Sequence, residues 1–209
     1  MVFDIRNAGP SDAAFIARNI VAAMGFDVFS PGSLDAVMDF DGRELTLREA
    51  IEAFVPICLR EDTLYYWGRT RISTVDGIPT GSLTAYPGAD YLSMRDLTWG
   101  DWGRSLGVDA TVSQEPECFP GEYYLDTLAV LPSWRGRSFE HCGVSDRTGH
   151  LLILDAFRQG RALGLKQASL IVDIDHPRVE EYYSGVGFRP AGQMMFFGHP
   201  YMRMRAALD

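Results

Sequence analysis

Residues 124–137 combine apolar, basic and glycine residues in a pattern that could hold an anion. The stretch begins as an apolar strand at Leu128, Ala129 and Val130. Pro132 then ends the strand, because proline has no N–H to donate to a sheet. The turn that follows places two arginines around a glycine, Arg135, Gly136 and Arg137. A glycine lets the backbone approach a ligand closely, and the next helix would offer its N-terminal N–H groups to phosphate.

A second block of residues makes the pattern more specific. The first stretch resembles the acyl-CoA-binding core of the GCN5-related N-acetyltransferases, in which a strand ends in Val-x-Pro-x-x-Arg-Gly-x-Gly-x-Gly. The later family pattern Asn-x-x-Ala-x-x-Leu-Tyr-x-x-x-Gly-Phe is similar to residues 176–188, with Tyr183, Gly187 and Phe188 at the matching positions. The two blocks follow the family order with an expected strand, residues 167–173, between them.

The chain departs from the family in the turn itself. Residues 138–148 stand between Arg137 and Gly149, where the family has its next glycines at once. We align Gly149 with the last family glycine, because the apolar residues that follow predict an amphipathic helix ending near Gly164. Residues 138–148 are therefore a loop insertion. It either leaves both ends of the phosphate turn in place or spoils the anion site.

The resemblance implies that an amine attacks a thioester directly, with acetyl-CoA as co-substrate. Tyr183 matches the tyrosine that protonates the leaving sulfur, and the N–H of Val130 would hold the thioester carbonyl. The implied cofactor-binding residues are Leu128, Ala129, Val130, Arg135, Gly136, Arg137, Gly149, His150 and His176. His176 stands where the family usually has asparagine, and its neighbour Pro177 is equally compatible with a helix start.

The base that removes a proton from the amine is less firmly indicated. Asp126 precedes Leu128 by two residues, so alternation along a strand puts it on the face of Tyr124 and Val130. Its carboxylate could reach an acceptor amine directly or through water, and the alternative is a solvated or salt-bridged acid. Glu122 is the reserve candidate. Tyr182 is expected in the core.

The elements that must position these residues follow from patterns along the chain. We expect a strand at residues 3–6, a helix after Pro10, a second helix capped by Thr46, and a hairpin turning at Asp76-Gly77. Residues 87–121 lack sustained periodicity and predict a long loop, which either shapes an acceptor pocket or only fills space. A strand pair near residues 193–206 ends the chain.

The fold class that follows is α/β (α+β). Residues 1–209 form a single domain with a mixed, mostly antiparallel central sheet, whose central strands splay and are flanked by helices. With 46% hydrophobic residues, the chain can bury a full core.

Composition limits the classes of partner. The net charge of −9 argues against a nucleic-acid surface and favours a cationic or amine acceptor. Three dispersed cysteines give no disulfide framework or zinc pattern, and His141 with Cys142 is a solvated loop, so no metal is expected. The chain contains no apolar stretch that would span a membrane, so we expect a cytoplasmic location.

The predicted function is transfer of an acyl group, acetyl above all, from acetyl-CoA to an amine of a small molecule or protein. A homodimer is compatible with the sequence. Two alternatives stay open: a non-catalytic CoA-binding or regulatory domain altered by the insertion, and an acyltransferase with a different acyl donor. The interval 138–148 distinguishes the enzyme from the non-catalytic domain, because only an ordered detour keeps Gly149 at the helix start.

Overall fold

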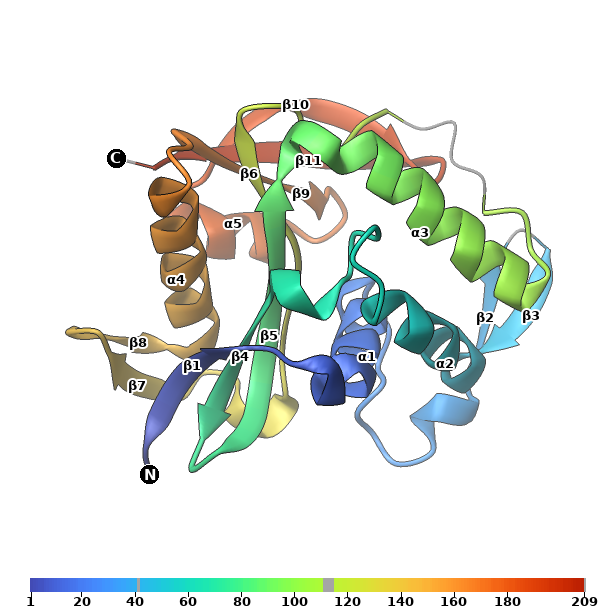
Figure 1. Cartoon of the computed structure of the whole chain (residues 1–209), viewed down its shortest axis with the longest axis horizontal. Helices are drawn as coiled ribbons and strands as arrows, with labels where there is room; N and C mark the ends of the chain where they lie inside the picture. Colours follow the sequence, from blue (N-terminus) through green and yellow to red (C-terminus); the bar gives the residue numbers. More distant parts are fainter. Residues whose placement is uncertain (41, 111–114, 209) are drawn as a thin grey trace.

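A seven-stranded sheet runs through the centre of the molecule (Figure 1), in a computed structural model that describes residues 1–40, 42–110 and 115–208. The strand order is β1-β4-β5-β6-β9-β11-β10, and every neighbouring pair is antiparallel except β6 with β9. The strands are β1 (Phe3–Asn7), β4 (Thr70–Val75), β5 (Ile78–Pro87), β6 (Glu122–Val130), β9 (Gln167–Asp173), β10 (Arg189–Phe196) and β11 (His199–Ala207). The predicted mixed, mostly antiparallel sheet is confirmed.

Helices cover both faces of this sheet. One face carries α1 (Ala13–Ala23), α2 (Leu47–Cys58) and α3 (Tyr91–Leu106), and the other carries α4 (Thr148–Ala162) and α5 (Pro177–Gly185) (Figure 1). One-turn 3₁₀ helices lie at Pro10–Asp12, Ser33–Asp35, Trp67–Arg69, Gly88–Asp90 and Pro132–Trp134. Within the described part of the chain, no helix has the length and apolar character needed to cross a bilayer.

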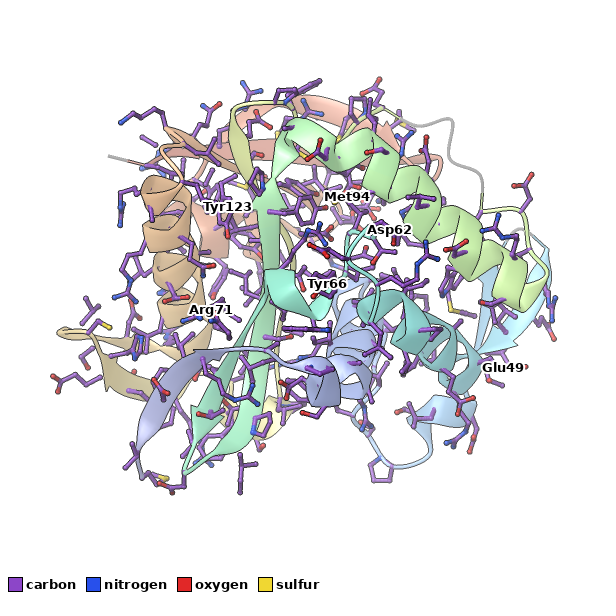
Figure 2. The ribbon with its side chains drawn as sticks, viewed as in Figure 1. Glu49, Asp62, Tyr66, Arg71, Met94 and Tyr123 are labelled. Atoms are coloured by element: carbon purple, nitrogen blue, oxygen red, sulfur yellow. The ribbon has the colours of Figure 1, made fainter. Side chains whose placement is uncertain are left out.

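Each face has its own hydrophobic core. Met94 of α3 belongs to the core on the α1–α3 side, whereas Tyr123 of β6 belongs to the core under α4 (Figure 2). Arg71 of β4 also faces α4, where its Nε donates to Asp155 Oδ2 at 2.7 Å. The sheet therefore separates two packed layers, as its amphipathic helices require.

The N-terminal elements follow the predicted pattern. α1 begins directly after the turn at Pro10–Asp12. α2 begins after Thr46, whose Oγ1 accepts from the N–H of Glu49 at 3.2 Å while the Glu49 carboxylate accepts from the N–H of Thr46 at 2.8 Å. This reciprocal pair is a capping box. β4 and β5 turn at Asp76 and Gly77, which both have positive φ as a type I′ turn requires.

The predicted long loop at residues 87–121 is wrong over much of its length, because α3 occupies Tyr91–Leu106. The buried positions recur at helical spacing, but three of them carry Arg95, Thr98 and Gly103. Polar and small residues on the buried face hid the apolar period on which the prediction depended. Residues 111–114 of that segment lie outside the described residues.

The insertion at residues 138–148 is a β-hairpin, not a loop. β7 (Ser138–His141) pairs with β8 (Val144–Arg147), and the turn residues Cys142 and Gly143 have φ of 49° and 77°. A second small hairpin, β2 (Val37–Phe40) with β3 (Arg43–Thr46), was not predicted. The turn of the first hairpin, Cys142-Gly143, is not an Asn-Gly or Asp-Gly pair, so its sequence signal is weak. The second has the pair Asp41-Gly42 between its strands in the sequence, which was the available signal.

The β6 strand contains a bulge opposite β5 and separates from β9 partway along its length. Thr84 is paired with Thr127 and Ala85 with Leu125, so Asp126 is the extra residue of a β-bulge. On the other side, β6 pairs with β9 only over residues 122–124. The two central strands therefore splay apart beyond Tyr124, as predicted.

Candidate active site

The free edge of β6 turns backbone groups toward the opening between the splayed strands. Leu131 donates its N–H to Thr80 of the β5 side at 2.9 Å, and Val130 stands directly opposite Gly81. In an antiparallel pair this makes Val130 a residue whose N–H and C=O face away from β5. Leu128, two residues earlier, faces the same way. β9 has already diverged at this level, so both N–H groups face the opening.

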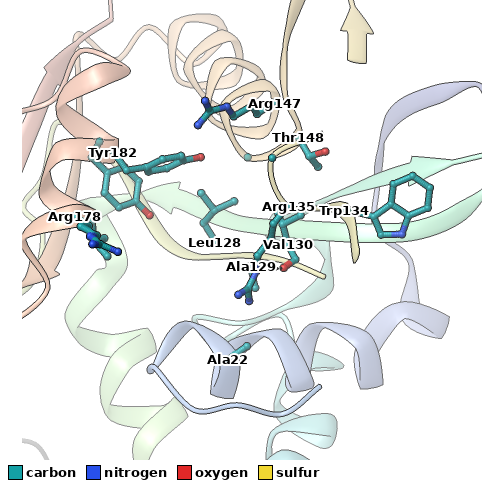
Figure 3. Close-up of a pocket in the computed structure, with 14 residues that line it drawn as sticks. Ala22, Leu128, Ala129, Val130, Trp134, Arg135, Arg147, Thr148, Arg178 and Tyr182 are labelled. Atoms are coloured by element: carbon teal, nitrogen blue, oxygen red, sulfur yellow. Dashed lines mark hydrogen bonds between the residues drawn. The ribbon is translucent and has the colours of Figure 1, made fainter. Parts of the chain in front are cut away.

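A first cavity of about 420 Å³ fills this opening between β6, the start of α4, and α5 (Figure 3). Leu128, Ala129 and Val130 line its strand wall, and Arg135 and Gly136 line the turn beyond it. Tyr182 and Tyr183 of α5 close the opposite side. Seven of the predicted site residues therefore meet in one place: Leu128, Ala129, Val130, Arg135, Gly136, Gly149 and Tyr183.

Three arginines from separate elements line the first cavity. Arg135 follows β6, Arg147 ends β8, and Arg178 lies in the first turn of α5 (Figure 3). The Nε of Arg135 donates to the carbonyl of Val130 at 2.9 Å, which fixes the turn against the strand end. Arg137 does not line this cavity. Its guanidinium lies 4.7 Å from the ring centroid of Trp134. The cationic lining would favour an anionic ligand.

The N-terminus of α4 opens onto the same cavity. The side-chain oxygen of Thr148 is buried without a hydrogen-bond partner, although Thr148 lines the cavity wall. Gly149 lies against Tyr182, since a Cβ at this position would stand 2.4 Å from the Tyr182 hydroxyl. A 15-residue helix whose first-turn N–H groups have no acceptor within the helix, with an unpaired hydroxyl beside them, is suited to phosphate.

The hairpin insertion returns the chain to the point where it left. Ser138 pairs with Arg147, and the N–H of Thr148 donates to the carbonyl of Arg137 at 3.3 Å. The phosphate turn and the start of α4 are therefore adjacent despite the residues between them. Gly149 is the second residue of α4, which is the outcome expected of an ordered detour.

His150 lies behind the cavity wall rather than on it. Its Nδ1 is 3.1 Å from Asp146 Oδ1 of the hairpin, and its ring centroid is 4.8 Å from that of Tyr182. This histidine therefore supports Tyr182 and the start of α4. Its assignment as a cofactor contact stays a prediction.

A second cavity of about 320 Å³ lies on the other side of Leu128 and Tyr183, which line both cavities. Its wall contains the end of α1 at residues 22–25, Asp126 of β6, and Asp173 of β9. His176 and Tyr201 complete the polar lining. His176, predicted to contact the cofactor, thus lies on this second cavity and is largely exposed.

Asp126 reaches the second cavity because of the β-bulge. The Tyr86 hydroxyl donates to its Oδ2, and Tyr65 also hydrogen-bonds to this carboxyl. Burial and the nearby charge of Glu117 outweigh these bonds and raise the pKa of Asp126 well above its usual range. Leu128 and Val130 instead pack toward the α4 side. The inference that Asp126 shares a face with Val130 is therefore wrong, since the extra residue inverts the alternation.

Tyr183 lies at the junction of the two cavities. Its ring packs edge-on against Phe188, with centroids 5.8 Å apart, and belongs to the edge of the core under α4. Burial raises the pKa of this phenol to about 12. The hydroxyl is therefore protonated throughout the neutral range and can act only as a donor to an anionic centre.

Two other candidates are excluded from the cavities by their own contacts. Glu122 is buried, accepts from Arg205 at 2.7 Å and from the Ser169 hydroxyl at 2.9 Å, and lines neither cavity. Cys142 occupies the exposed tip of the hairpin. The role of reserve base for Glu122 therefore has no geometric support.

The cavity residues that were not predicted include Arg147, Thr148, Arg178, Asp173 and Tyr201, with Tyr182 as a wall residue. Arg147 and Arg178 stand beside assigned positions in the sequence, so basic residues flanking both motifs were the available signal. Asp173 ends a predicted strand that neighbours β6. The Asp173 carboxylate accepts from His199 Nε2 at 2.8 Å, and this bond with that of the Asp175 N–H outweighs burial and lowers its pKa.

Comparison with known proteins gives matches at the level of structure. No protein-family model matches the chain, and no curated protein sequence matches it. An N-acetyltransferase from Staphylococcus aureus Mu50 superposes with a TM-score of 0.70 at 19% identity, covering 97% of this chain and 100% of its own. A structure described as an acetyltransferase gives 0.68 at 23% identity, covering 99% and 100%.

A third solved structure was determined with a ligand. The PaiA N-acetyltransferase from Thermoplasma acidophilum, in complex with coenzyme A, superposes with a TM-score of 0.56 at 13% identity, covering 99% of each chain. Other similar structures include members of the GCN5-related family. The chain therefore has the fold of the GCN5-related N-acetyltransferases, which is the fold that its two motifs predict.

Proposed function

We propose that this protein transfers an acetyl group from acetyl-CoA to an amine. The observation that carries the proposal is the adjacency of two cavities of opposite charge, which share Leu128 and Tyr183 as wall residues beside the open edge of β6. The arginine-lined cavity suits an anionic co-substrate, and the carboxylate-lined cavity suits a cationic amine. The fold shared with acetyltransferases, one of them solved with coenzyme A, supports the same conclusion.

Several groups of the first cavity fit the pyrophosphate of CoA. The unpaired Thr148 hydroxyl and the N-terminal N–H groups of α4 would donate hydrogen bonds to phosphate oxygens. Arg135, Arg147 and Arg178 would balance the negative charge of the phosphates. The splayed edge of β6 would offer the backbone groups of Leu128 to the pantetheine amides. Bound acetyl-CoA would supply the thioester, whose carbonyl carbon is attacked by the amine nitrogen.

Asp126 is the proposed base. An acceptor enters the second cavity as an ammonium ion and must lose a proton before its nitrogen can attack. The proton would pass to the Asp126 carboxylate, directly or through one water, breaking an N–H bond and forming an O–H bond. A raised carboxyl pKa brings the base closer to the pKa of an amine and makes the transfer less unfavourable.

Val130 and Tyr183 would act on the two ends of the thioester. The outward N–H of Val130 would donate to the carbonyl oxygen as negative charge develops there. The Tyr183 hydroxyl would donate to sulfur as the C–S bond breaks and the C–N bond forms. Because its pKa of about 12 exceeds the ~8.5 of an ordinary thiol, Tyr183 would keep its proton and stabilise the departing thiolate by a hydrogen bond.

The ordered hairpin favours an enzyme over a non-catalytic derivative. Its ends meet at Arg137 and Thr148, so the anion site keeps both of its parts. The hairpin also contributes Arg147 to the first cavity. An insertion that had abolished the site would have displaced Gly149 from the start of α4.

The test is acetyl-CoA-dependent thiol release with a panel of amines, comprising small monoamines, diamines and peptides with a free N-terminus. We expect release that depends on both acetyl-CoA and one class of amine, with the acetylated amine identified by mass spectrometry. Asp126→Asn should abolish most of it, whereas Asp175→Asn, a change at an exposed carboxylate that lines neither cavity, should not. Wild-type protein that binds acetyl-CoA yet acetylates none of the amines would overturn the proposal.

A further inference from the structure

A cluster of buried polar side chains lies behind the second cavity. Glu117 is 6% exposed, and its two carboxylate oxygens accept from Tyr91 at 2.5 Å and from Tyr124 at 2.6 Å. It lines neither cavity. A carboxylate taken this far from water loses much of its hydration, and its two phenol bonds only partly compensate for that loss.

The cluster extends to Asp126 through neighbouring phenols. Tyr86 donates to Asp126, and the rings of Tyr86 and Tyr124 lie 5.8 Å apart on adjacent strands. Tyr124 is in turn bonded to Glu117. The two carboxyl groups are therefore bonded to different tyrosines whose rings touch, and only Asp126 reaches the cavity where the acceptor would lie.

The charged and titratable groups around the pair are unequally distributed. Burial raises the pKa of Glu117, whereas the bonds from Tyr124 and Tyr91 and the positive charges of Arg95 from α3 and Arg203 from β11 oppose that rise. Asp126 has no such cation among the described groups that act on it, and faces only phenols and the charge of Glu117. The other titratable and charged groups that surround the pair are Tyr65, Tyr86, Tyr91, Tyr124, Tyr201, Cys118, Arg95 and Arg203, with Asp173 and His176 across the cavity.

Two like charges in one dry region cannot both form without a large cost. The arginines favour the first negative charge on Glu117, and that charge opposes the ionisation of Asp126. The carboxylate of Asp126 therefore binds a proton, or a cation, more tightly than an isolated aspartate would. An incoming ammonium ion can supply first the cation and then the proton, because it approaches with a positive charge and transfers its proton to Asp126.

We propose that Glu117 is a positioning residue for the reaction, which sets the proton affinity of Asp126 from inside the core without touching the substrate. This inference rests on the proposed function, in which Asp126 takes the proton of the amine. Its own content is the coupling of the two carboxyl groups through Tyr86 and Tyr124. The coupling is a property of the protein alone and can be measured without substrate.

The test compares Glu117→Gln with wild type in two measurements. The first follows the Asp126 carboxyl carbon by ¹³C NMR as pH changes, and the second records kcat/KM against pH. We expect the Asp126 carboxyl of the variant to titrate at lower pH, the acid limb of the rate profile to move in the same direction, and kcat at pH 8 to fall about tenfold because the base is weaker. The Kd for acetyl-CoA should not change.

Glu122→Gln is the matched control. Glu122 is a buried carboxylate near the start of β6, but its partners are Arg205 and Ser169 rather than the tyrosine cluster. Its removal should leave the Asp126 titration and the rate profile in place. Tyr124→Phe, which keeps both carboxyl groups, provides a second variant should Glu117→Gln not fold, and should shift the same titration through the lost bond to Glu117.

The outcomes separate this inference from the proposed function. An Asp126 titration that is the same in Glu117→Gln and wild type contradicts the coupling, whatever the activity. An equal shift in Glu122→Gln also contradicts it, because the effect would then be a general consequence of perturbing the core. A shift in Glu117→Gln alone, in a protein that acetylates no amine, supports the coupling and refutes the proposed function.

Discussion

The two cavities that meet at Leu128 and Tyr183 are built by different means. The first takes its binding groups from the ends of elements: the edge of β6, the N-terminus of α4, and the turns that carry Arg135 and Arg147. The second takes them from side chains in the body of the fold, above all Asp126. The first is cationic and the second acidic. Under the proposed function, the co-substrate would be recognised by local geometry and the acceptor by long-range packing.

The largest expected effect is on the acidic side. Asp126→Asn removes the proposed base while keeping the shape of the side chain, so kcat/KM should fall by about 10²–10⁴-fold. Binding of acetyl-CoA, measured by calorimetry, should not change, because Asp126 does not line the first cavity. A loss of acetyl-CoA binding in this variant would show that the two cavities are not independent.

Tyr183→Phe tests the junction itself. The ring keeps its contact with Phe188, but the donor to sulfur is lost, so kcat should fall by about 10²-fold with little change in the Kd for acetyl-CoA. A more acidic leaving thiol should depend less on the donor and lose less rate. Undiminished turnover with the ordinary thioester would remove Tyr183 from the mechanism.

The arginines of the first cavity should affect binding rather than chemistry. Arg147→Ala removes a cation from the wall and should weaken acetyl-CoA binding about 10- to 100-fold, the usual value of a charge-assisted hydrogen bond of roughly 1.5–3 kcal/mol. Arg137→Ala, which only loses the contact with Trp134, should change the Kd little and is the control. The comparison sharpens if added salt weakens wild type more than Arg147→Ala. Equal losses in both variants would contradict the assigned wall.

A smaller effect is expected on stability. The folded-state pKa of Asp126 lies above its unfolded value of ~3.9. At pH values between these two pKa values the native state binds more protons than the unfolded state, so stability falls as pH rises. Asp126→Asn removes this penalty. Its Tm should exceed that of wild type at pH 8 by about 2–4 °C, or about 1 kcal/mol, and the two should converge toward pH 4. A Tm difference independent of pH would show that the carboxyl is not destabilised in the fold.

The sequence predicted the first cavity better than the second for a physical reason. Leu128, Val130, Arg135 and Gly149 act through backbone position and local turns, which nearby residues determine. The insertion concealed how the turn continues, since nothing in residues 138–148 signals that Arg137 and Thr148 meet again. The position of Arg137 could not be predicted for a related reason, because its contact with Trp134 depends on the path of the turn, and its role as a cofactor contact stays a prediction.

The second cavity depends on features that alternation cannot reveal. A single extra residue at Asp126 inverts which side chains of β6 face each core, so the strand pattern placed Asp126 in the right region with the wrong neighbours. α3, whose Tyr91 and Arg95 act on Glu117, was missed because its buried face is partly polar. The general fold was accessible because most strands and helices have ordinary patterns and caps.

The central claim is that the interrupted phosphate turn still holds the co-substrate, and calorimetric titration of the wild-type protein with acetyl-CoA tests it most directly. The account predicts binding with a Kd of about micromolar, near −8 kcal/mol, which weakens when Arg135 and Arg147 are both replaced by alanine. No heat of binding at millimolar acetyl-CoA would contradict the account, and would leave Asp126 and Tyr183 as structural residues of a fold without its reaction.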